Sequence, residues 1–363
     1  MDRNELQEQA VMLLEQVKRL LCQWATGVGK SNVVLKFLQR HPGYYCLILV
    51  PEQNNIQNWL DEFAKFNVPT DNVQIICYAS FHKYERTQWN LLVFDEAPHL
   101  DTQKRLKIGS SVRGNYVLAL GAVIDDDETY ALEACYGKFT KNYISLKQAI
   151  QWKILPCPTV NICHISLDNK DKKYLYKGVM YTAKEMYDIH QNNVDKAVGM
   201  YNISATSLHK RRMLSMGSAR KRFLGTLKTE AVQMLCDKLT EHHKRFLCFC
   251  VSIAQARELG GDLAFTSKTP ASAKLLERFN NHEIDSLYVV GKLIEGQNLT
   301  DIEHGVITQL GGTSRITVQS IGRIMRSKEP VIWIPIVFGT KDDSFLRTVT
   351  YEIPEDYIHH YNL

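Results

Sequence analysis

Short apolar runs alternate with amphipathic helical patterns along the first part of this chain. Continuous apolar runs bounded by polar turns are typical of strands that a parallel sheet buries on both faces. The strands predicted in this part are residues 19–23, 44–50, 73–78, 91–94 and 116–120. Strands that alternate with helices predict right-handed crossovers and a parallel α/β sheet. We therefore expect residues 1–153 to form one α/β lobe.

The second part of the chain resumes this alternation after an interruption. Residues 154–158 carry two prolines that would stiffen a linker, and residues 159–167 alternate as a strand does, so 154–167 is the expected crossover. Residues 168–229 are polar, basic and rich in tyrosine, which predicts a mainly helical insertion. Residues 230–363 are expected to form a second α/β lobe. Its predicted strands are 246–250, 286–290, 305–308 and 331–337, and its predicted helices include 230–240, 252–259 and 318–325.

A glycine-rich turn joins the first predicted strand to a helix expected over residues 31–40. In this context, backbone N–H groups and the helix N-terminus bind phosphate. Lys30 would reach the β- and γ-phosphates of a nucleotide, and the Ser31 hydroxyl would ligate Mg²⁺. Trp24 replaces the usual first glycine, and the alternative interpretation is a turn with a surface lysine. The predicted nucleotide-binding segment consists of Ala25, Thr26, Gly27, Val28, Gly29, Lys30 and Ser31.

Two carboxylates follow the apolar run 91–94, in the segment Asp95-Glu96-Ala97-Pro98-His99. The carboxyl end of a parallel strand is where doubly wound sheets bind their ligands. Asp95 would hold Mg²⁺ through water, and Glu96 would orient or deprotonate an attacking water. The alternative is an ordinary acidic turn, but a phosphate-binding loop upstream in the same pattern favours the catalytic interpretation. His99 could couple the site to the other lobe or cap a loop.

The composition is that of an ordinary globular protein, with 45% hydrophobic and 23% charged residues in 363. No stretch approaches the roughly 20 apolar residues that cross a bilayer, and the charged N-terminal segment lacks the apolar core of a signal peptide. Nine cysteines include no C-x-x-C pair, which favours reduced thiols over disulfides or zinc. We therefore expect a cytoplasmic protein, either of a cell or of an infected host cell.

Positive charge gathers in the predicted insertion, although the net charge of the chain is only +5. Clustered cations of this kind contact nucleic-acid phosphates, and the alternative is a solvated helix face. The candidate contacts are Lys210, Arg211, Arg212, Arg220 and Arg222, with Lys228 close behind. The tyrosines at positions 174, 176 and 181 could stack on bases or pack the insertion's own core. The acidic run 125–128 is expected to be a solvated loop.

Together these motifs resemble those of superfamily 2 helicases and translocases, over nearly the whole chain. The resemblance implies two tandem RecA-like domains, each with a parallel sheet, that use ATP and Mg²⁺. The segments at 25–31 and 95–99 are similar to motif I and to a DEAH-type motif II with an unusual Pro98. Gln7 occupies the position of the glutamine that contacts adenine. By the same resemblance, the nucleic-acid contacts of motifs Ia, Ib and IV fall at Pro51, Ser80 and Ser252.

The resemblance extends to motifs V and VI near the end of the chain. Residues 291–299 are similar to motif V through Gly296. Gln319, Gly322, Arg323 and Arg326 fill the Q-x-x-G-R-x-x-R pattern of motif VI. The resemblance implies that Gly296 and Gln319 contribute to nucleotide binding and that both arginines face the γ-phosphate. Arg326 is the better candidate for the arginine finger.

Motif III departs from the family pattern. It is normally Ser-Ala-Thr after a strand, and here the strand ends in Gly121-Ala122-Val123. In the family this motif helps to link hydrolysis to strand separation. We therefore expect hydrolysis to survive, and translocation, annealing or remodelling to be the main output instead of efficient unwinding.

The sequence thus predicts an ATP-dependent helicase or translocase that acts on nucleic acid. Trp59 and Glu62, on the helix after Pro51, look more like the DNA-remodelling and restriction-associated branch than the DEAD-box RNA branch, so DNA is favoured. The compact size is similar to that of phage-encoded recombination and repair helicases. The alternatives are an RNA helicase, a slow nucleotide-gated binding module, and a motor subunit that docks a protein partner through residues 168–229.

Overall fold

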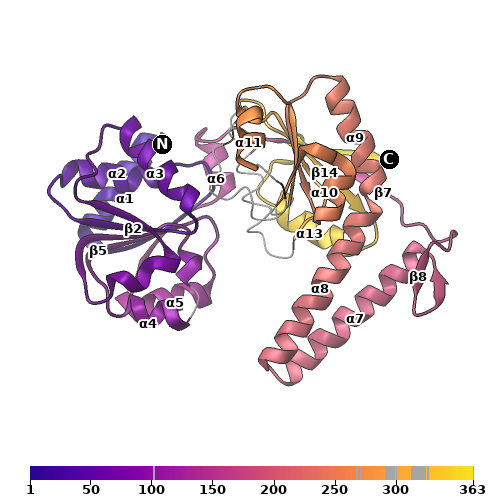
Figure 1. Cartoon of the computed structure of the whole chain (residues 1–363), viewed down its shortest axis with the longest axis horizontal. Helices are drawn as coiled ribbons and strands as arrows, with labels where there is room; N and C mark the ends of the chain where they lie inside the picture. The colour runs from indigo at the N-terminus through magenta and orange to yellow at the C-terminus, as the bar shows by residue number, and fades with distance from the viewer. Residues whose placement is uncertain are drawn as a thin grey trace. The chain divides into compact units, whose positions relative to one another are not determined.

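The computed structural model describes residues 1–100, 103–266, 269, 272–290, 299, 301–311, 324 and 327–362. The side chains of residues 103–105 and 272 are not described. The described chain divides into two compact units, Met1–Pro156 and the part from Cys157 onward. Each unit contains one parallel sheet with helices packed on it (Figure 1). This confirms the predicted α/β class with two parallel-sheet domains.

The first unit is built on a six-stranded sheet in the order β3-β2-β4-β5-β1-β6, in which every pairing is parallel. Its strands are β1 (Arg19–Trp24), β2 (Cys46–Val50), β3 (Val73–Cys77), β4 (Gln88–Phe94), β5 (Arg113–Gly121) and β6 (Thr140–Ile144). All five strands expected in this part are present. The sixth, β6, was not predicted because four of its five residues are at least partly exposed at the sheet edge.

Helices and short 3₁₀ helices connect these strands. They are α1 (Arg3–Val17), α2 (Ser31–Arg40), α3 (Gln53–Lys65), η1 (Tyr78–Tyr84), η2 (Ala97–Leu100), α4 (Gln103–Gly109), α5 (Asp126–Tyr136) and α6 (Leu146–Gln151). Residues 125–128, expected to be a loop, instead begin α5, because Asp125 and Glu128 form a reciprocal capping box. Acidic residues at this end also stabilise the helix dipole.

The second unit is built on a seven-stranded sheet in the order β11-β12-β10-β13-β14-β7-β15, again with parallel pairing throughout. Its strands are β7 (Thr159–Ile165), β10 (Phe246–Cys250), β11 (Ala264–Phe265), β12 (Ser286–Val290), β13 (His304–Ile307), β14 (Val331–Val337) and β15 (Ile358–Asn362). The strand next to the predicted linker, β7, lies between β14 and β15 and is therefore part of this sheet. The strands β11 and β15 were not predicted.

The helices of the second sheet are α9 (Thr229–Glu241), α10 (Ile253–Gly260), α11 (Ser272–Asn280) and α13 (Lys341–Thr350), with the single turns η3 (Gly261–Leu263) and η5 (Glu355–Tyr357). Helices 230–240 and 252–259 were expected at these places. The helix predicted over 318–325 lies outside the described residues except for Ile324, whose side chain is buried.

Residues between β7 and α9 form a small hairpin and two long helices that project from the second sheet (Figure 1). The hairpin pairs β8 (Tyr174–Tyr176) with β9 (Val179–Tyr181), and the helices are α7 (Ala183–Ile203) and α8 (Ser207–Leu227). The ring of Tyr174 packs edge-on against Phe223, with centroids 5.2 Å apart. This contact favours the packing interpretation for Tyr174.

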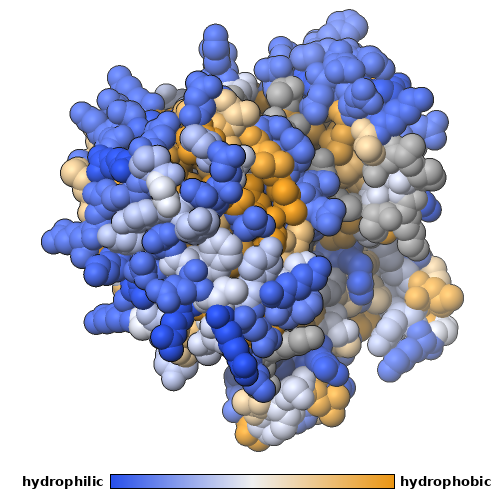
Figure 2. Space-filling view, turned by 60° about the vertical axis from the view of Figure 1, so that its left-hand side comes forward, coloured by the Kyte–Doolittle hydropathy of each residue, from blue (hydrophilic) through white to orange (hydrophobic). Residues whose placement is uncertain are grey.

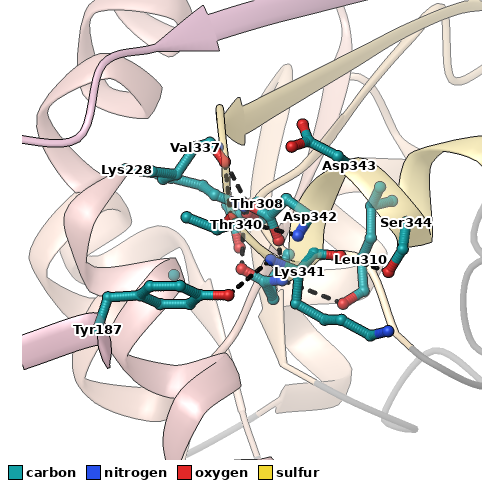
Figure 3. A network of polar contacts seen from close by, with 12 residues as sticks. Tyr187, Lys228, Thr308, Leu310, Val337, Thr340, Lys341, Asp342, Asp343 and Ser344 are labelled. Carbon is teal, nitrogen blue, oxygen red and sulfur yellow. Dashed lines mark hydrogen bonds and ion pairs between the residues drawn. The ribbon is translucent and has the colours of Figure 1, made fainter. Parts of the chain in front are cut away.

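A buried ion pair fixes the base of this helical insertion to the second sheet (Figure 3). Lys228, at the junction of α8 and α9, places Nζ 2.7 Å from Asp342 Oδ2, and neither side chain is exposed. Nζ also donates to the carbonyl of Thr308, which follows β13. The backbone N–H of Lys341 donates to the Tyr187 hydroxyl on α7. Both insertion helices are thus held at the carboxyl edge of the sheet.

Hydrophilic residues predominate on the face of the molecule seen in Figure 2, and the largest group of apolar residues lies near the centre of the view. Within the described residues, no helix has both the length and the apolar content needed to cross a membrane.

We predict that Lys228→Met lowers the free energy of unfolding by about 3–5 kcal/mol, because it leaves the Asp342 carboxylate buried without its cation. Chemical denaturation followed by circular dichroism measures this change. Lys210→Met, at an exposed position on α8, is the control and should change stability by less than about 0.5 kcal/mol. Equal stability of the two single variants would contradict the prediction.

Candidate nucleotide-binding site

The glycine-rich segment after β1 adopts the backbone conformation that a phosphate loop requires. Gly27 and Gly29 have φ angles of +92° and +96°, which side-chain-bearing residues rarely adopt. Lys30 is the N-cap of α2, and no side chain caps this helix end. The N–H groups of Asn32 and Val33 donate to the carbonyls of Gly29 and Lys30 within this turn. The N-terminal end of the helix dipole still favours an anion at this place.

Helix α1 braces this loop through a buried glutamine. The Gln7 side chain is 3% exposed, and its Nε2 donates to the carbonyl of Gly29 over 3.2 Å. A Cβ atom at Gly29 would lie only 2.5 Å from this Nε2, so the close approach requires glycine. The contact with adenine expected for Gln7 stays a prediction, since the contact described here is with the loop.

Trp24 accounts for the missing first glycine of the motif. It is the last residue of β1, its side chain is fully buried, and its Nε1 donates to Asn142 Oδ1 on β6 over 2.7 Å. This position therefore serves the core of the sheet and not the loop. The Trp24 carbonyl instead accepts a hydrogen bond of 3.1 Å from Lys30 Nζ, which folds the lysine back over the loop.

The acidic pair lies at the same edge of the sheet, at the end of β4. Only β5 separates β4 from β1, so the two strand ends are about 10 Å apart. The Asp95 backbone N–H donates to Leu49 on β2, and Glu96 has a φ angle of +49°. A left-handed conformation at a residue other than glycine is strained and is often found at functional sites.

Two aromatic side chains hold Asp95 in place. Trp59 on α3 donates from Nε1 to Asp95 Oδ2 over 2.9 Å. The Tyr78 hydroxyl, at the start of η1, donates to the Asp95 carbonyl over 3.0 Å. The sequence did not reveal either contact, because an aromatic residue on the apolar face of a helix is ordinarily a core residue.

The charged groups of the site influence one another. Burial raises the pKa of Asp95 to about 6, and the negative charge of Glu96 adds to this shift, whereas the hydrogen bond from Trp59 and the charge of Lys30 oppose it. Burial also lowers the pKa of the Lys30 ammonium, against the attraction of Glu96 and Asp95. Lysine and carboxylates are thus close enough to interact in a poorly solvated site.

The residues present fit a magnesium nucleotide. Among the described residues, no group of three or more His, Cys, Asp or Glu side chains could hold a metal by itself. Mg²⁺ typically needs only one or two protein carboxylates or hydroxyls, together with substrate phosphates and water. Asp95 and Ser31 carry oxygens of this kind. In addition, Asn32 Oδ1 is buried beside the loop and has no hydrogen-bond partner within the described part of the chain.

The segment in the motif III position is closely packed and apolar. A Cβ atom at Gly121 would lie 2.7 Å from Cγ1 of Ile124 and 3.7 Å from Cδ of Pro98. A serine here would need a shift of Ile124, so the missing hydroxyl reflects local packing. His99 stacks on Tyr78, with ring centroids 6.0 Å apart, inside the first unit.

The predicted nucleic-acid contacts of the first unit lie after β2 and β3. Pro51 precedes α3, and Ser80 lies within η1. In the second unit, the Ser252 hydroxyl caps α10 by accepting the Gln255 backbone N–H over 3.2 Å. Their proposed contacts with nucleic acid stay predictions.

The predicted basic contacts on α8 divide into exposed and buried residues. The exposed ones are Lys210, Arg211, Arg212 and Arg222. The prediction was wrong for Arg220, which is 6% exposed and donates to Gln191 Oε1 on α7 over 2.7 Å. Lys228 is buried as well, in its ion pair. The remaining predicted site residues, Gly296, Gln319, Arg323 and Arg326, lie outside the described residues.

This chain is similar in sequence to a curated DNA translocase. It is 22% identical over 93% of its length to the DNA 3'-5' translocase XPB2 of Sulfurisphaera tokodaii, and the match covers 82% of that protein. No protein-family model matches the chain.

Solved structures of low sequence identity share the fold. The Hef helicase domain of Pyrococcus furiosus matches 94% of this chain and 97% of its own, with a TM-score of 0.55 and 13% identity. The ATP-dependent Type ISP restriction-modification enzyme LlaBIII, solved bound to DNA, matches 99% of this chain with a TM-score of 0.59 and 12% identity. This chain spans 31% of that larger enzyme chain. The chain thus shares the fold of a solved helicase domain, in agreement with the fold that the resemblance implies.

We predict that Gly29→Ala weakens nucleotide binding at least about tenfold. The left-handed conformation costs an alanine about 1–2 kcal/mol, and the new methyl group would collide with Gln7. Titration with a fluorescent ATP analogue measures the affinity. Gly43→Ala is the matched control, because a Cβ atom there meets nothing within 4 Å. Similar affinities of both variants for the nucleotide would show that the contact between Gln7 and Gly29 does not support nucleotide binding.

We also predict that magnesium-dependent nucleotide binding weakens as the pH falls through about 6. Because the pKa of Asp95 is raised to about 6, its proton competes with Mg²⁺ at a higher pH than for an ordinary aspartate. Below that pH, affinity should fall by up to about tenfold per unit. Calorimetric titration between pH 5 and 8 tests this, with magnesium-free nucleotide as the control. The prediction fails if magnesium-dependent affinity is constant over this range.

Proposed function

We propose that this protein is an ATP-hydrolysing translocase or helicase that acts on DNA. The observation that carries the proposal is the meeting of the Gly27–Ser31 loop with Asp95 and Glu96 at one edge of a parallel sheet. The similarity to a DNA translocase and to a DNA-bound restriction enzyme supports DNA as the substrate. Trp59 and Glu62, on the helix after Pro51, favour the same branch of the superfamily over the RNA helicases.

In the proposed reaction, the loop and the N-terminus of α2 bind the phosphates of ATP. Lys30 leaves the Trp24 carbonyl and contacts the β- and γ-phosphates, which its charge stabilises. Ser31 and Asp95 would hold Mg²⁺, which supplies charge neutralisation at the phosphates when it is bound. Glu96 accepts a hydrogen bond from the attacking water and orients it.

We propose that the arginines of the motif VI segment complete this reaction. By the family resemblance, Arg323 and Arg326 neutralise the charge that develops on the γ-phosphate, and an arginine in this role can raise the rate by about 10³ or more. Gly296 and Gln319 would contribute to binding of the nucleotide. Nucleotide binding and release would then alternate with movement along the DNA.

DNA binding is proposed to be directed at the backbone. Pro51, Ser80 and Ser252 would contact phosphates or sugars, and such contacts carry little sequence information. The exposed α8 cations, Lys210, Arg211, Arg212 and Arg222, would add affinity that falls with salt. Residues 196–229 contain no aspartate or glutamate, so these cations are not neutralised by neighbours in sequence.

A second candidate is the motor subunit of a larger complex. Two large apolar side chains are exposed where α7 and α8 meet, since Ile203 is 89% and Leu208 is 71% exposed. Exposed apolar residues at a projecting tip are suited to a protein partner. This candidate predicts little ATP turnover with DNA alone and stimulation by the partner.

The steady-state rate of ATP hydrolysis, measured with single-stranded, duplex and forked DNA and with RNA, tests the proposal. We expect stimulation by at least one class of DNA and loss of turnover in Lys30→Ala. We expect Arg326→Ala to lose turnover by about 10³-fold while it still binds ATP. Arg347→Ala, at an exposed position on α13, is the control and should hydrolyse ATP normally.

Each other outcome has a distinct meaning. Stimulation by RNA alone would move the protein to the RNA helicases. A slow rate that no nucleic acid changes would favour the gated binding module or the subunit with a missing partner. Normal hydrolysis by Arg326→Ala would refute the proposed arginine finger.

A further inference from the structure

The Asp95 turn is held by two aromatic residues that come from the two segments proposed to contact DNA. Trp59 lies on α3, which begins two residues after Pro51, and Tyr78 begins η1, which contains Ser80. We propose that Trp59 and Tyr78 are positioning residues that transmit DNA binding to the ATP site. The inference rests on the proposed function, since it names the contacts through which bound DNA would stimulate ATP hydrolysis.

The contact through Trp59 is well suited to transmit a displacement. The side chain is 4% exposed and packs against Phe63, with ring centroids 6.1 Å apart, so it moves with α3 and not independently of it. Its Nε1 donates to Oδ2 of the Asp95 carboxylate over 2.9 Å. A small shift of α3 when DNA binds near Pro51 therefore reorients the carboxylate that is proposed to hold Mg²⁺.

Tyr78 acts on the backbone of the same turn. Its side chain is 2% exposed, and its ring packs against Phe94 and His99. In the sequence, Phe94 precedes the acidic pair and His99 follows it. The Tyr78 hydroxyl donates to the Asp95 carbonyl over 3.0 Å. The next residue, Glu96, has its φ angle in the left-handed region, so rotation of this peptide changes the direction of the proposed water-orienting side chain.

The segment that links hydrolysis to strand separation in the family, motif III, is altered in this chain. The motif III segment has no hydroxyl at positions 121–123, and the space at Gly121 is filled by Ile124. Trp59 and Tyr78 reach Asp95 from the loops after β2 and β3 instead. Between them they contact both the carboxylate and the backbone of this residue, so two independent bonds connect the proposed DNA-contacting segments to it.

The test compares Trp59→Phe and Tyr78→Phe with the wild-type chain. Each substitution keeps the ring and removes only the hydrogen-bond donor. The measurements are the ATPase kcat with and without saturating DNA, the Mg²⁺ dependence of the rate, the KM for ATP, and the affinity for labelled DNA. Trp89→Phe is the matched control, since its lost bond, from Nε1 to Thr87 Oγ1, lies away from the site. Tyr116→Phe, on β5, is the control for removal of a tyrosine hydroxyl.

We expect the ratio of DNA-stimulated to basal kcat to fall at least about tenfold in each variant, because a misplacement of about 1 Å can cost about a hundredfold in rate. DNA affinity should stay within about twofold, and both controls should keep the wild-type ratio. Trp59→Phe should also need more Mg²⁺ for half-maximal rate, whereas Tyr78→Phe should not.

Several results would overturn the inference. An unchanged stimulation ratio in both variants would show that the contacts do not carry the signal. An equal loss of basal and stimulated kcat would assign the two residues to the reaction itself. If DNA does not stimulate the ATPase kcat of the wild-type chain, the proposed function is rejected, and the coupling with it. Normal stimulation in the wild type together with normal ratios in the variants would reject the coupling alone.

Discussion

The candidate site depends on one electrostatic constraint, the confinement of a lysine and two carboxylates at the edge of a buried sheet. The Lys30 ammonium attracts both carboxylates, which offsets part of the cost of burying these charges, whereas the two carboxylates repel each other. Hydrogen bonds along β4, β5 and β1 keep the charges from separating. A nucleotide with its divalent cation adds charges of both signs to such a site. Ligand binding therefore lowers the electrostatic cost of holding the lysine and the carboxylates there.

The sequence was sufficient wherever structure is determined by neighbours along the chain. Buried strands were predicted because each is a continuous apolar run, and the phosphate loop because glycine spacing dictates the backbone. The edge strands β6 and β15 were missed for the opposite reason, since a strand with one neighbour can be polar. The strand β11 has only two residues, which is too short to form a pattern.

Contacts between elements distant in sequence were not predictable in the same way. The sequence placed Arg220 and Arg222 together as exposed cations, yet only two residues apart one is buried against α7 and the other is exposed. Nor could it reveal that Trp59 and Tyr78 converge on Asp95, because each is also an ordinary core residue. The candidate residues of the site could thus be named from motifs, whereas the contacts that support them are visible only in the fold.

The position of β7 has a consequence for how the two units form. Every strand of the first sheet is paired within one continuous stretch of chain, so this unit can fold as soon as that stretch has been synthesised. In the second sheet β7 lies between β14 and β15, and the chain between β7 and β14 is longer than the whole first unit. Such distant pairing is intrinsically slow. During synthesis β7 therefore stays without both of its partner strands until the last part of the chain has been made. Its apolar residues Val160 and Ile162 are exposed to other chains and to chaperones for that time.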